Sequence, residues 1–195
     1  MAKTKLPAVY VASELDQLAA LKSRLRGRIC DVVYNMGSAT VHEIADQLGV
    51  PVSTLYSHLE MLVGVGLLHE GEPVRTTKNF ARTYNAPARK LRVTHQTDNE
   101  DVREAIADVV ASQLRFAEKE FRKAAHSEEF DSAGKPESRV RSGSVVGWLG
   151  AKDVRELNRL MGEVFALFEG TSPGPGRRLQ GMTFVSRPIE TEPKD

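Results

Sequence analysis

The sequence predicts a mainly α-helical protein with a small β component, and three observations lead to this fold class. Residues 40–68 contain two short amphipathic segments that are separated by a Gly-Val-Pro turn. Residues 68–85 have the pattern of a β-hairpin, and a long amphipathic segment follows the polar connector at 89–98. These patterns predict a two-helix motif with a hairpin within residues 1–95, and a helical region with a β-α-β unit within residues 96–195.

The first helix of the pair is expected to begin at Thr40. Thr40 and Glu43 have the T-x-x-E spacing of a capping box, in which each side chain bonds the backbone N–H of the other residue. Apolar residues then recur at helical spacing, and Gly49 is the residue type that commonly ends a helix. The apolar positions are Val41, Ile44, Ala45 and Leu48. The prediction is a short helix with one buried face.

The second helix is expected over residues 51–63, because Pro51 has the fixed φ that suits a helix start. Its core stripe repeats at helical spacing and consists of Leu55, Leu59 and Leu62, flanked by Val52 and Val63. The opposite face carries Ser53, Thr54, Tyr56, Ser57 and His58. These are hydrogen-bonding side chains without a negative charge, and such a surface suits contact with phosphates and base edges. An ordinary solvated helix face is the alternative interpretation.

A β-hairpin is expected after this helix, which Gly64 and Gly66 end. The outgoing arm starts at Leu67-Leu68, and residues 80–84 form the return arm. The turn and return arm carry the basic residues Arg75, Lys78 and Arg82, next to Thr76, Thr77 and Asn79. Phosphate contact or minor-groove insertion fits this composition, although Glu70 and Glu72 dilute the positive charge. A solvated hairpin without a ligand remains the alternative.

Residues 7–88 resemble the winged helix-turn-helix transcription regulators of the broad ArsR-like class. Residues 26–29 are similar to the "R-x-x-I" step of the leading helices, which are expected over 13–21 and 26–33. Residues 53–59, STLYSHL, resemble the recognition-helix motif "S-T-V-x-x-H-L", and the tyrosine is most similar to the subgroup with "T-V-Y-Y-H-L". Residues 66–68 match the "G-L-V" that leads into the wing. The resemblance implies that the 51–63 helix reads DNA and that the 68–85 hairpin is the wing.

The recognition helix departs from the commoner pattern of this class at two positions. Val52 replaces a residue that is frequently polar, and Ser57 replaces a residue that is frequently arginine. A direct arginine–guanine contact from this helix is therefore not carried over. We expect base specificity to depend more on Tyr56 and on the shape of the DNA.

Metal sensing and enzymatic catalysis are both disfavoured by the sequence. The chain has one cysteine, Cys30, which lies in an apolar run and is expected to be a small buried hydrophobe. The five histidines lack metal-ligand spacing, so no metal and no cofactor are predicted, and a site shared between two chains stays open. There is no Gly-x-Ser-x-Gly elbow, phosphate loop or His-Glu-x-x-His motif, so the protein is not expected to be an enzyme.

Charge is distributed unevenly along the chain, although its formal net charge is only +1. Residues 1–95 hold 12 Lys/Arg and 8 Asp/Glu, whereas residues 96–195 hold 15 and 18. A basic cluster made of Lys22, Arg24, Arg26 and Arg28 is expected to contribute to the surplus of the DNA reader. The sequence has neither an apolar run long enough to cross a membrane nor a secretion signal, so a cytoplasmic location is expected.

The second half is expected to serve dimerisation, effector binding or both. A long amphipathic helix is predicted over 99–125, capped by Asn99 or Asp101, followed by a mobile loop over 126–140. A strand at 141–149, a helix at 151–168 and a strand at 178–186 would form the β-α-β unit. Trp148, Phe165 and Phe184 are candidates to line an effector pocket, with core packing as the alternative. Either the 99–125 helix or the leading helices could form the dimer.

The function predicted from these observations is sequence-specific regulation of transcription. A homodimer, expected to be a repressor rather than an activator, would read palindromic operators in double-stranded DNA with the 51–63 helix and the 68–85 wing. The predicted DNA contacts are Ser53, Thr54, Tyr56, Ser57, His58, Arg75, Lys78 and Arg82. The effector, if there is one, is unknown. A winged-helix protein-interaction module without DNA binding is the alternative.

Overall fold

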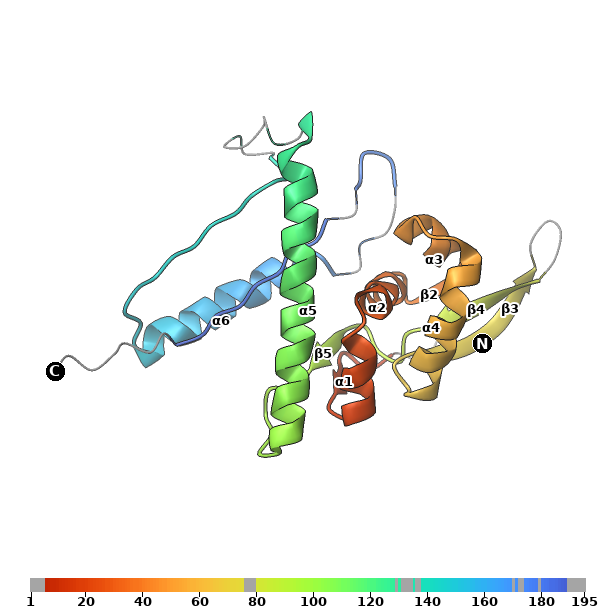
Figure 1. The fold of residues 1–195 in the computed structure, drawn as a ribbon, viewed down its shortest axis with the longest axis horizontal. Helices are drawn as coiled ribbons and strands as arrows, with labels where there is room; N and C mark the ends of the chain where they lie inside the picture. Colours follow the sequence, from red (N-terminus) through yellow and green to blue (C-terminus); the bar gives the residue numbers. More distant parts are fainter. Residues whose placement is uncertain are drawn as a thin grey trace.

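A computed structural model gives the fold of residues 6–75, 80–128, 130, 135, 138–169, 171, 174–178 and 180–188. Within these residues the fold combines six helices with two small β-sheets (Figure 1). Helices α1 (Leu15–Leu21), α2 (Arg24–Met36), α3 (Val41–Leu48) and α4 (Val52–Gly64) share one apolar core. The long helix α5 (Glu100–Ala125) packs against α1 and α2, while α6 (Ala151–Ala166) lies apart from them.

The predicted helix pair at 40–68 is present with the expected start and stop. Thr40 Oγ1 accepts a hydrogen bond from the Glu43 N–H at 3.2 Å, and the Thr40 N–H donates to the Glu43 carboxylate at 2.7 Å. This capping box opens α3, and Gly49 ends it in the left-handed region with φ of 65°. Pro51 is the residue that precedes α4, where its fixed φ of −61° aligns the chain with the helix.

The predicted core positions of both helices are buried. Leu55, Leu59 and Leu62 on α4 are fully buried, as is Ile44 on α3. Gln17 of α1 fixes the end of α4, since its Nε2 donates to the Val65 carbonyl at 3.1 Å and to the Tyr10 hydroxyl at 2.8 Å. The orientation of α4 is therefore set by apolar packing on one face and by a polar tie at its C-terminal end.

The predicted hairpin is formed by strands β3 (His69–Arg75) and β4 (Phe80–Asn85), which pair antiparallel. A third strand that the sequence did not suggest, β2 (Ser38–Thr40), pairs with the other edge of β4. The hairpin projects beyond the helices in Figure 1. A register shift lies between Gly71 and Val74. At Gly71 an added Cβ would lie 2.6 Å from Thr83 Oγ1, so this close approach requires glycine.

The connector at 89–98 is not purely a linker, contrary to prediction. Residues Leu91–Val93 form β5, which pairs in parallel with β1 (Tyr10–Ala12). Each strand has only three residues, too short for an alternating pattern to be recognised in the sequence. This pairing ties the segment that leads into α5 to the N-terminal part of the fold.

Helix α5 begins as predicted, because the Asn99 side chain accepts hydrogen bonds from the Asp101 and Val102 N–H groups. The burial of its apolar stripe differs along the helix. Val102 and Val109 are buried against the N-terminal core, whereas Leu114 and Phe121 are exposed. The first half of α5 therefore packs within its own chain, and the second half leaves Leu114 and Phe121 on the surface.

The β-α-β unit predicted for residues 141–186 is wrong. Helix α6 is present, but residues 141–149 and the described residues of 178–186 form no strand. Apolar and β-branched residues favour an extended chain, but a strand also needs a neighbouring edge that supplies its backbone hydrogen bonds. Within the loop predicted at 126–140, residues 129, 131–134, 136 and 137 lie outside the described residues.

Candidate nucleic-acid interface

The predicted contact residues on α4 lie on its open face. Ser53, Thr54, Tyr56 and Ser57 are exposed, and His58 is half-buried. The face carries no acidic side chain before Glu60, which is one turn further along the helix. Its hydroxyl groups can both donate and accept hydrogen bonds, so this surface is chemically able to contact phosphates and base edges.

The N-terminal end of α4 adds a second feature suited to an anion. No side chain caps this end, because the residue before the helix is Pro51. The first N–H groups of a helix have no partner within the helix, and the helix dipole gives this end a partial positive charge. Ser53 and Thr54 lie in the same first turn, so backbone and side-chain donors of α4 are available to one phosphate.

The hairpin brings basic and aromatic side chains to its far end. Arg75 and Phe80 are opposite each other in the strand register, and both are exposed. Arg82 lies two residues further along β4 and is also exposed, while Ala81 and Thr83 between these positions are buried. This alternation gives β4 one open face that carries Phe80 and Arg82. Lys78, with Thr76, Thr77 and Asn79, lies outside the described residues.

Arg82 of β4 is engaged by two other side chains of the hairpin, Glu70 and Tyr84. Arg82 forms an exposed ion pair with Glu70, with 3.8 Å between Nη1 and the carboxylate oxygen. Burial raises the pKa of Tyr84, opposed by the hydrogen bond from Arg82, and the Glu70 and Tyr56 groups raise the pKa further. Arg82 is therefore engaged by groups of the hairpin that a phosphate would have to compete with.

The basic cluster Lys22, Arg24, Arg26 and Arg28 contacts α1 and α5 and does not extend the predicted DNA-reading surface. Lys22 pairs with Asp108 of α5 at 2.5 Å, and the Arg24 guanidinium lies 3.6 Å from the ring centroid of Phe116, also on α5. Arg26 donates from Nε to the Ala20 carbonyl at 2.6 Å, at the C-terminal end of α1. Arg28 lies 5.7 Å from the same Phe116 ring. The assignment of this cluster to the DNA-reading surface is therefore wrong, because α5 contacts Lys22, Arg24 and Arg28, and α1 binds Arg26.

Cys30 is buried, as expected for a small hydrophobic residue in the apolar run of α2. Burial raises the pKa of its thiol, with a further contribution from the nearby Asp31, so the reactive thiolate is disfavoured. Over the ranges that the structure describes, no group of three His, Cys, Asp or Glu side chains could hold a metal ion. No helix in the same ranges has both the length and the apolar character to cross a bilayer.

Comparison with known protein families gives a match over residues 21–71, to a family described as a helix-turn-helix domain. The segment α3–turn–α4 is a helix-turn-helix. This family is typical of ArsR-like regulators, and its presence suggests DNA-binding regulation. The match ends at the start of β3, so the return strand of the hairpin and everything after it lie beyond the helix-turn-helix match. No curated protein matches the chain.

Two features near the helix-turn-helix were missed from the sequence. Phe80 is 71% exposed next to Arg75, and an exposed aromatic in a strand of alternating burial could have been found from the period-two pattern. The ion pair between Glu70 and Arg82 depends on the hairpin register, which no local pattern specifies. The aromatic pocket predicted from Trp148, Phe165 and Phe184 is not formed, because Trp148 is 93% exposed and the other two are also exposed.

Proposed function

We propose that the protein is a sequence-specific DNA-binding regulator of transcription. Helix α4 would enter the major groove, and the β3–β4 hairpin would act as a wing on the flanking backbone or minor groove. The observation that carries this proposal is the acid-free, hydrogen-bonding face of α4 within the matched helix-turn-helix domain. Ser53, Thr54, Tyr56, Ser57 and His58 would contact bases and phosphates, with Arg75, Lys78 and Arg82 on the wing.

Several physical features support a contribution from the hairpin. The open face of β4 carries the exposed Arg82, so one stretch of DNA could touch both this strand and α4. Phe80, exposed at the far end of the hairpin, has the chemistry of an apolar wedge between base steps. A hairpin that projects from the helices would reach a groove next to the one occupied by α4.

A homodimer is the working form in this proposal. The basic surplus of residues 1–95 is modest, so one copy would bind weakly and in a strongly salt-dependent manner. Two copies would place two α4 helices in successive major grooves about 34 Å apart, and their operators would be imperfect palindromes. Helix α6 buries none of its described side chains, although Val154, Leu160 and Phe165 are apolar. A second copy that covers this face and the second half of α5 would remove that surface from water.

The sign of regulation proposed is repression. A compact DNA reader can repress by occupying a promoter, without a segment that contacts the polymerase. The competing function is a protein-interaction module, favoured by the ion pair that partly occupies Arg82 and by the modest charge of the domain. Salt distinguishes the two, because DNA binding releases counterions and weakens steeply as salt is raised, whereas an apolar protein interface responds little.

The experiment that tests DNA binding is selection of retained duplexes from a random-sequence pool at two salt concentrations. We expect an enriched palindrome that the Tyr56→Ala, Arg82→Ala double variant loses. Lys152→Ala is the matched control, because it removes one exposed positive charge from α6 without touching the helix-turn-helix. Equal retention by wild type and double variant, without an enriched sequence, would reject DNA reading in favour of the interaction module.

The homodimer is tested separately by sedimentation velocity. We expect the wild type to sediment as a dimer and the Val154→Ser, Leu160→Ser variant to shift toward monomer. Val145→Ser is the control, because Val145 is exposed but lies before α6 in an extended segment. A wild type that stays monomeric at concentrations where it occupies an operator would contradict the homodimer.

A further inference from the structure

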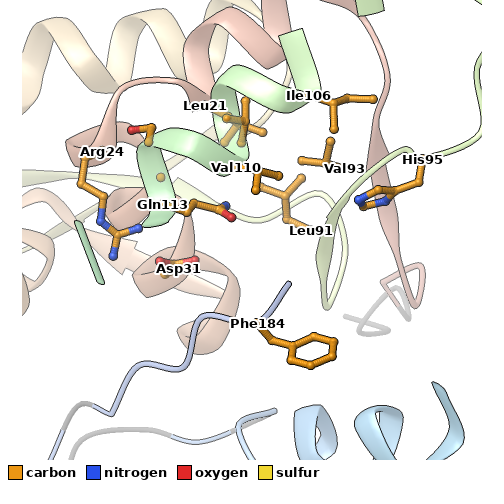
Figure 2. A pocket seen from close by; sticks show the side chains of 13 residues that line it. Leu21, Arg24, Asp31, Leu91, Val93, His95, Ile106, Val110, Gln113 and Phe184 are labelled. Carbon is orange, nitrogen blue, oxygen red and sulfur yellow. The ribbon is translucent and has the colours of Figure 1, made fainter. Parts of the chain in front are cut away.

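A cavity of about 280 Å³ lies between α2, β5 and α5, with one wall completed by a residue from the C-terminal segment. Figure 2 shows that its lining is divided. Arg24, Asp31 and Gln113 lie toward one side, and Leu91, Val93 and Val110 lie toward the other, where His95 is next to Val93. Phe184 lies across the opening from Leu91. A recess with a polar end and an apolar end is suited to a small amphipathic molecule.

The polar end carries one positive and one negative side chain, Arg24 and Asp31, whose charges influence each other without a direct salt bridge. Arg24 Nε is buried and has no hydrogen-bond partner in the part of the chain that the structure describes. The Arg24 guanidinium is instead stacked on Phe116, a contact that uses its flat face and leaves its edge free. A buried donor without a partner is destabilising, so a ligand acceptor that reaches the Arg24 guanidinium would offset part of a cost that the free protein bears.

Asp31 lies seven residues after Arg24 on α2, so the two side chains project from the same helix face, and Figure 2 shows them next to each other. Asp31 is exposed, and its carboxylate has no hydrogen bond or close ion pair among the described residues. Burial among the surrounding protein atoms nevertheless raises the pKa of Asp31, against the opposing charges of Arg24 and Arg28.

Gly27 lies between these two charges on α2 and also lines the cavity. A Cβ added at Gly27 would meet no atom within 4 Å, so the space above the helix is open here. A helix-interior glycine is destabilising relative to alanine. The glycine therefore gives up helix stability at a position where any side chain would enter the cavity.

We propose that this cavity binds a small zwitterionic ligand with an apolar body, of the class of an apolar α-amino acid. The ligand carboxylate would accept from the edge of the Arg24 guanidinium, and its ammonium group would donate to Asp31, above Gly27. The apolar body would lie against Leu91, Val110 and Phe184. A ligand with only a carboxylate would be repelled by Asp31, and one with only an ammonium group would be repelled by Arg24. The paired head group distinguishes this class from simple acids and amines.

The test is isothermal titration of the full chain, without DNA, with three matched probes. L-Phenylalanine carries both charges, 3-phenylpropionate only the carboxylate, and phenethylamine only the ammonium group. We expect L-phenylalanine to bind one site per chain with a dissociation constant at or below about 1 mM, and each analogue to bind at least tenfold more weakly. Because no DNA is present, the result is independent of the proposed DNA-binding function.

Two substitutions in the cavity identify the site. Asp31→Asn keeps the shape of the side chain and removes its charge, and we expect at least tenfold weaker binding of L-phenylalanine. Gly27→Leu would fill the space above α2 and abolish binding while leaving the protein at least as stable, because leucine favours the helix. Gly162→Leu is the matched control: this helical glycine of α6 also has open space around it and is absent from the cavity lining.

Three results would overturn the proposal. Equal or tighter binding of 3-phenylpropionate, or an Asp31→Asn variant that binds L-phenylalanine like the wild type, would reject the zwitterionic head group. Undiminished binding by a folded Gly27→Leu variant would move the site away from this cavity. Absence of heat from all three probes at about 10 mM would reject ligand binding of this class altogether.

Discussion

Helices α4 and α6 both have amphipathic sequences, but the apolar face of α4 is buried and that of α6 is exposed. The apolar stripe of α4 is fully buried at Leu55, Leu59 and Leu62. The apolar stripe of α6 has no buried member, and Leu160 and Phe165 are more than two-fifths exposed. Helical periodicity therefore predicts that a face will be covered, but not that the same chain covers it. The difference separates the helix-turn-helix, which has a complete core, from α6, whose apolar face would be covered by a second copy of the chain in our proposal.

The largest expected effect compares one leucine from each helix. Leu59→Ala would leave a cavity in the core of the reader, and we expect the free energy of unfolding to fall by about 2–5 kcal/mol. Leu160→Ala removes the same atoms from a half-exposed site, so it should change monomer stability by less than about 1 kcal/mol. Urea denaturation at low protein concentration measures both. A Leu160→Ala loss as large as that of Leu59→Ala would mean that α6 is packed in the monomer.

The parts of the fold that could be predicted from the sequence have local causes. The start of α3 depends on Thr40 and Glu43, three residues apart, and the start of α5 on Asn99 and the two N–H groups that follow. The stripe of α4 repeats within thirteen residues. Each of these patterns lies within a few turns of helix, where spacing alone decides which groups meet.

The parts that could not be predicted depend on partners far along the chain. The pairing of β1 with β5 joins two three-residue strands with about eighty residues between them, and no local pattern specifies that pairing. The sequence indicated that Arg24 was a positive charge available to DNA, but in the structure its guanidinium stacks on Phe116 of α5. The exposed side chains of α4 were predicted correctly, because they lie opposite an apolar stripe that is recognisable in the sequence. Their contact with DNA remains a prediction.

A second comparison concerns the caps of α3 and α6, each of which has an acidic side chain bonded to the backbone N–H that opens the helix. Thr40→Ala removes the side-chain oxygen that accepts from the Glu43 N–H, and we expect a loss of about 1 kcal/mol in global stability. Asp153→Ala removes the bond from the Gly150 N–H, 2.9 Å long, at the start of α6. Because α6 has no buried side chain, we expect it to fray locally without a shift in the main unfolding transition. Amide hydrogen exchange at α3 and α6 would distinguish global destabilisation from local fraying. A cooperative loss of global stability after Asp153→Ala would contradict the expectation that α6 frays independently.

A smaller effect is expected at the ion pair of the hairpin. Glu70→Gln removes the carboxylate that pairs with Arg82 and also removes a negative charge beside the proposed DNA surface. Exposed ion pairs contribute about 0–1 kcal/mol, so affinity for a selected duplex should rise by up to about fivefold. Glu163→Gln on α6 is the control, since it breaks an ion pair with Arg159 away from the hairpin. Fluorescence anisotropy at fixed salt measures the change, and weaker binding by Glu70→Gln would show that Glu70 positions Arg82 for DNA rather than competing with it.

The smallest expected effect is a pH-dependent one at Asp31, which faces the cavity between the two regions. Burial raises the pKa of Asp31 in the folded protein, so the folded state holds this proton more tightly than the unfolded chain does. The ionised carboxylate therefore destabilises the fold at neutral pH, and this destabilisation disappears as pH falls below the ordinary aspartate range, where both states are protonated. An amide side chain cannot ionise, so the Asp31→Asn variant should be more stable than the wild type at about pH 7 and equally stable near pH 3. Thermal unfolding across this range tests the sign: a variant that is less stable at neutral pH would show that the Arg24 and Arg28 charges outweigh desolvation, and that Asp31 stabilises the free protein instead of remaining available for a ligand.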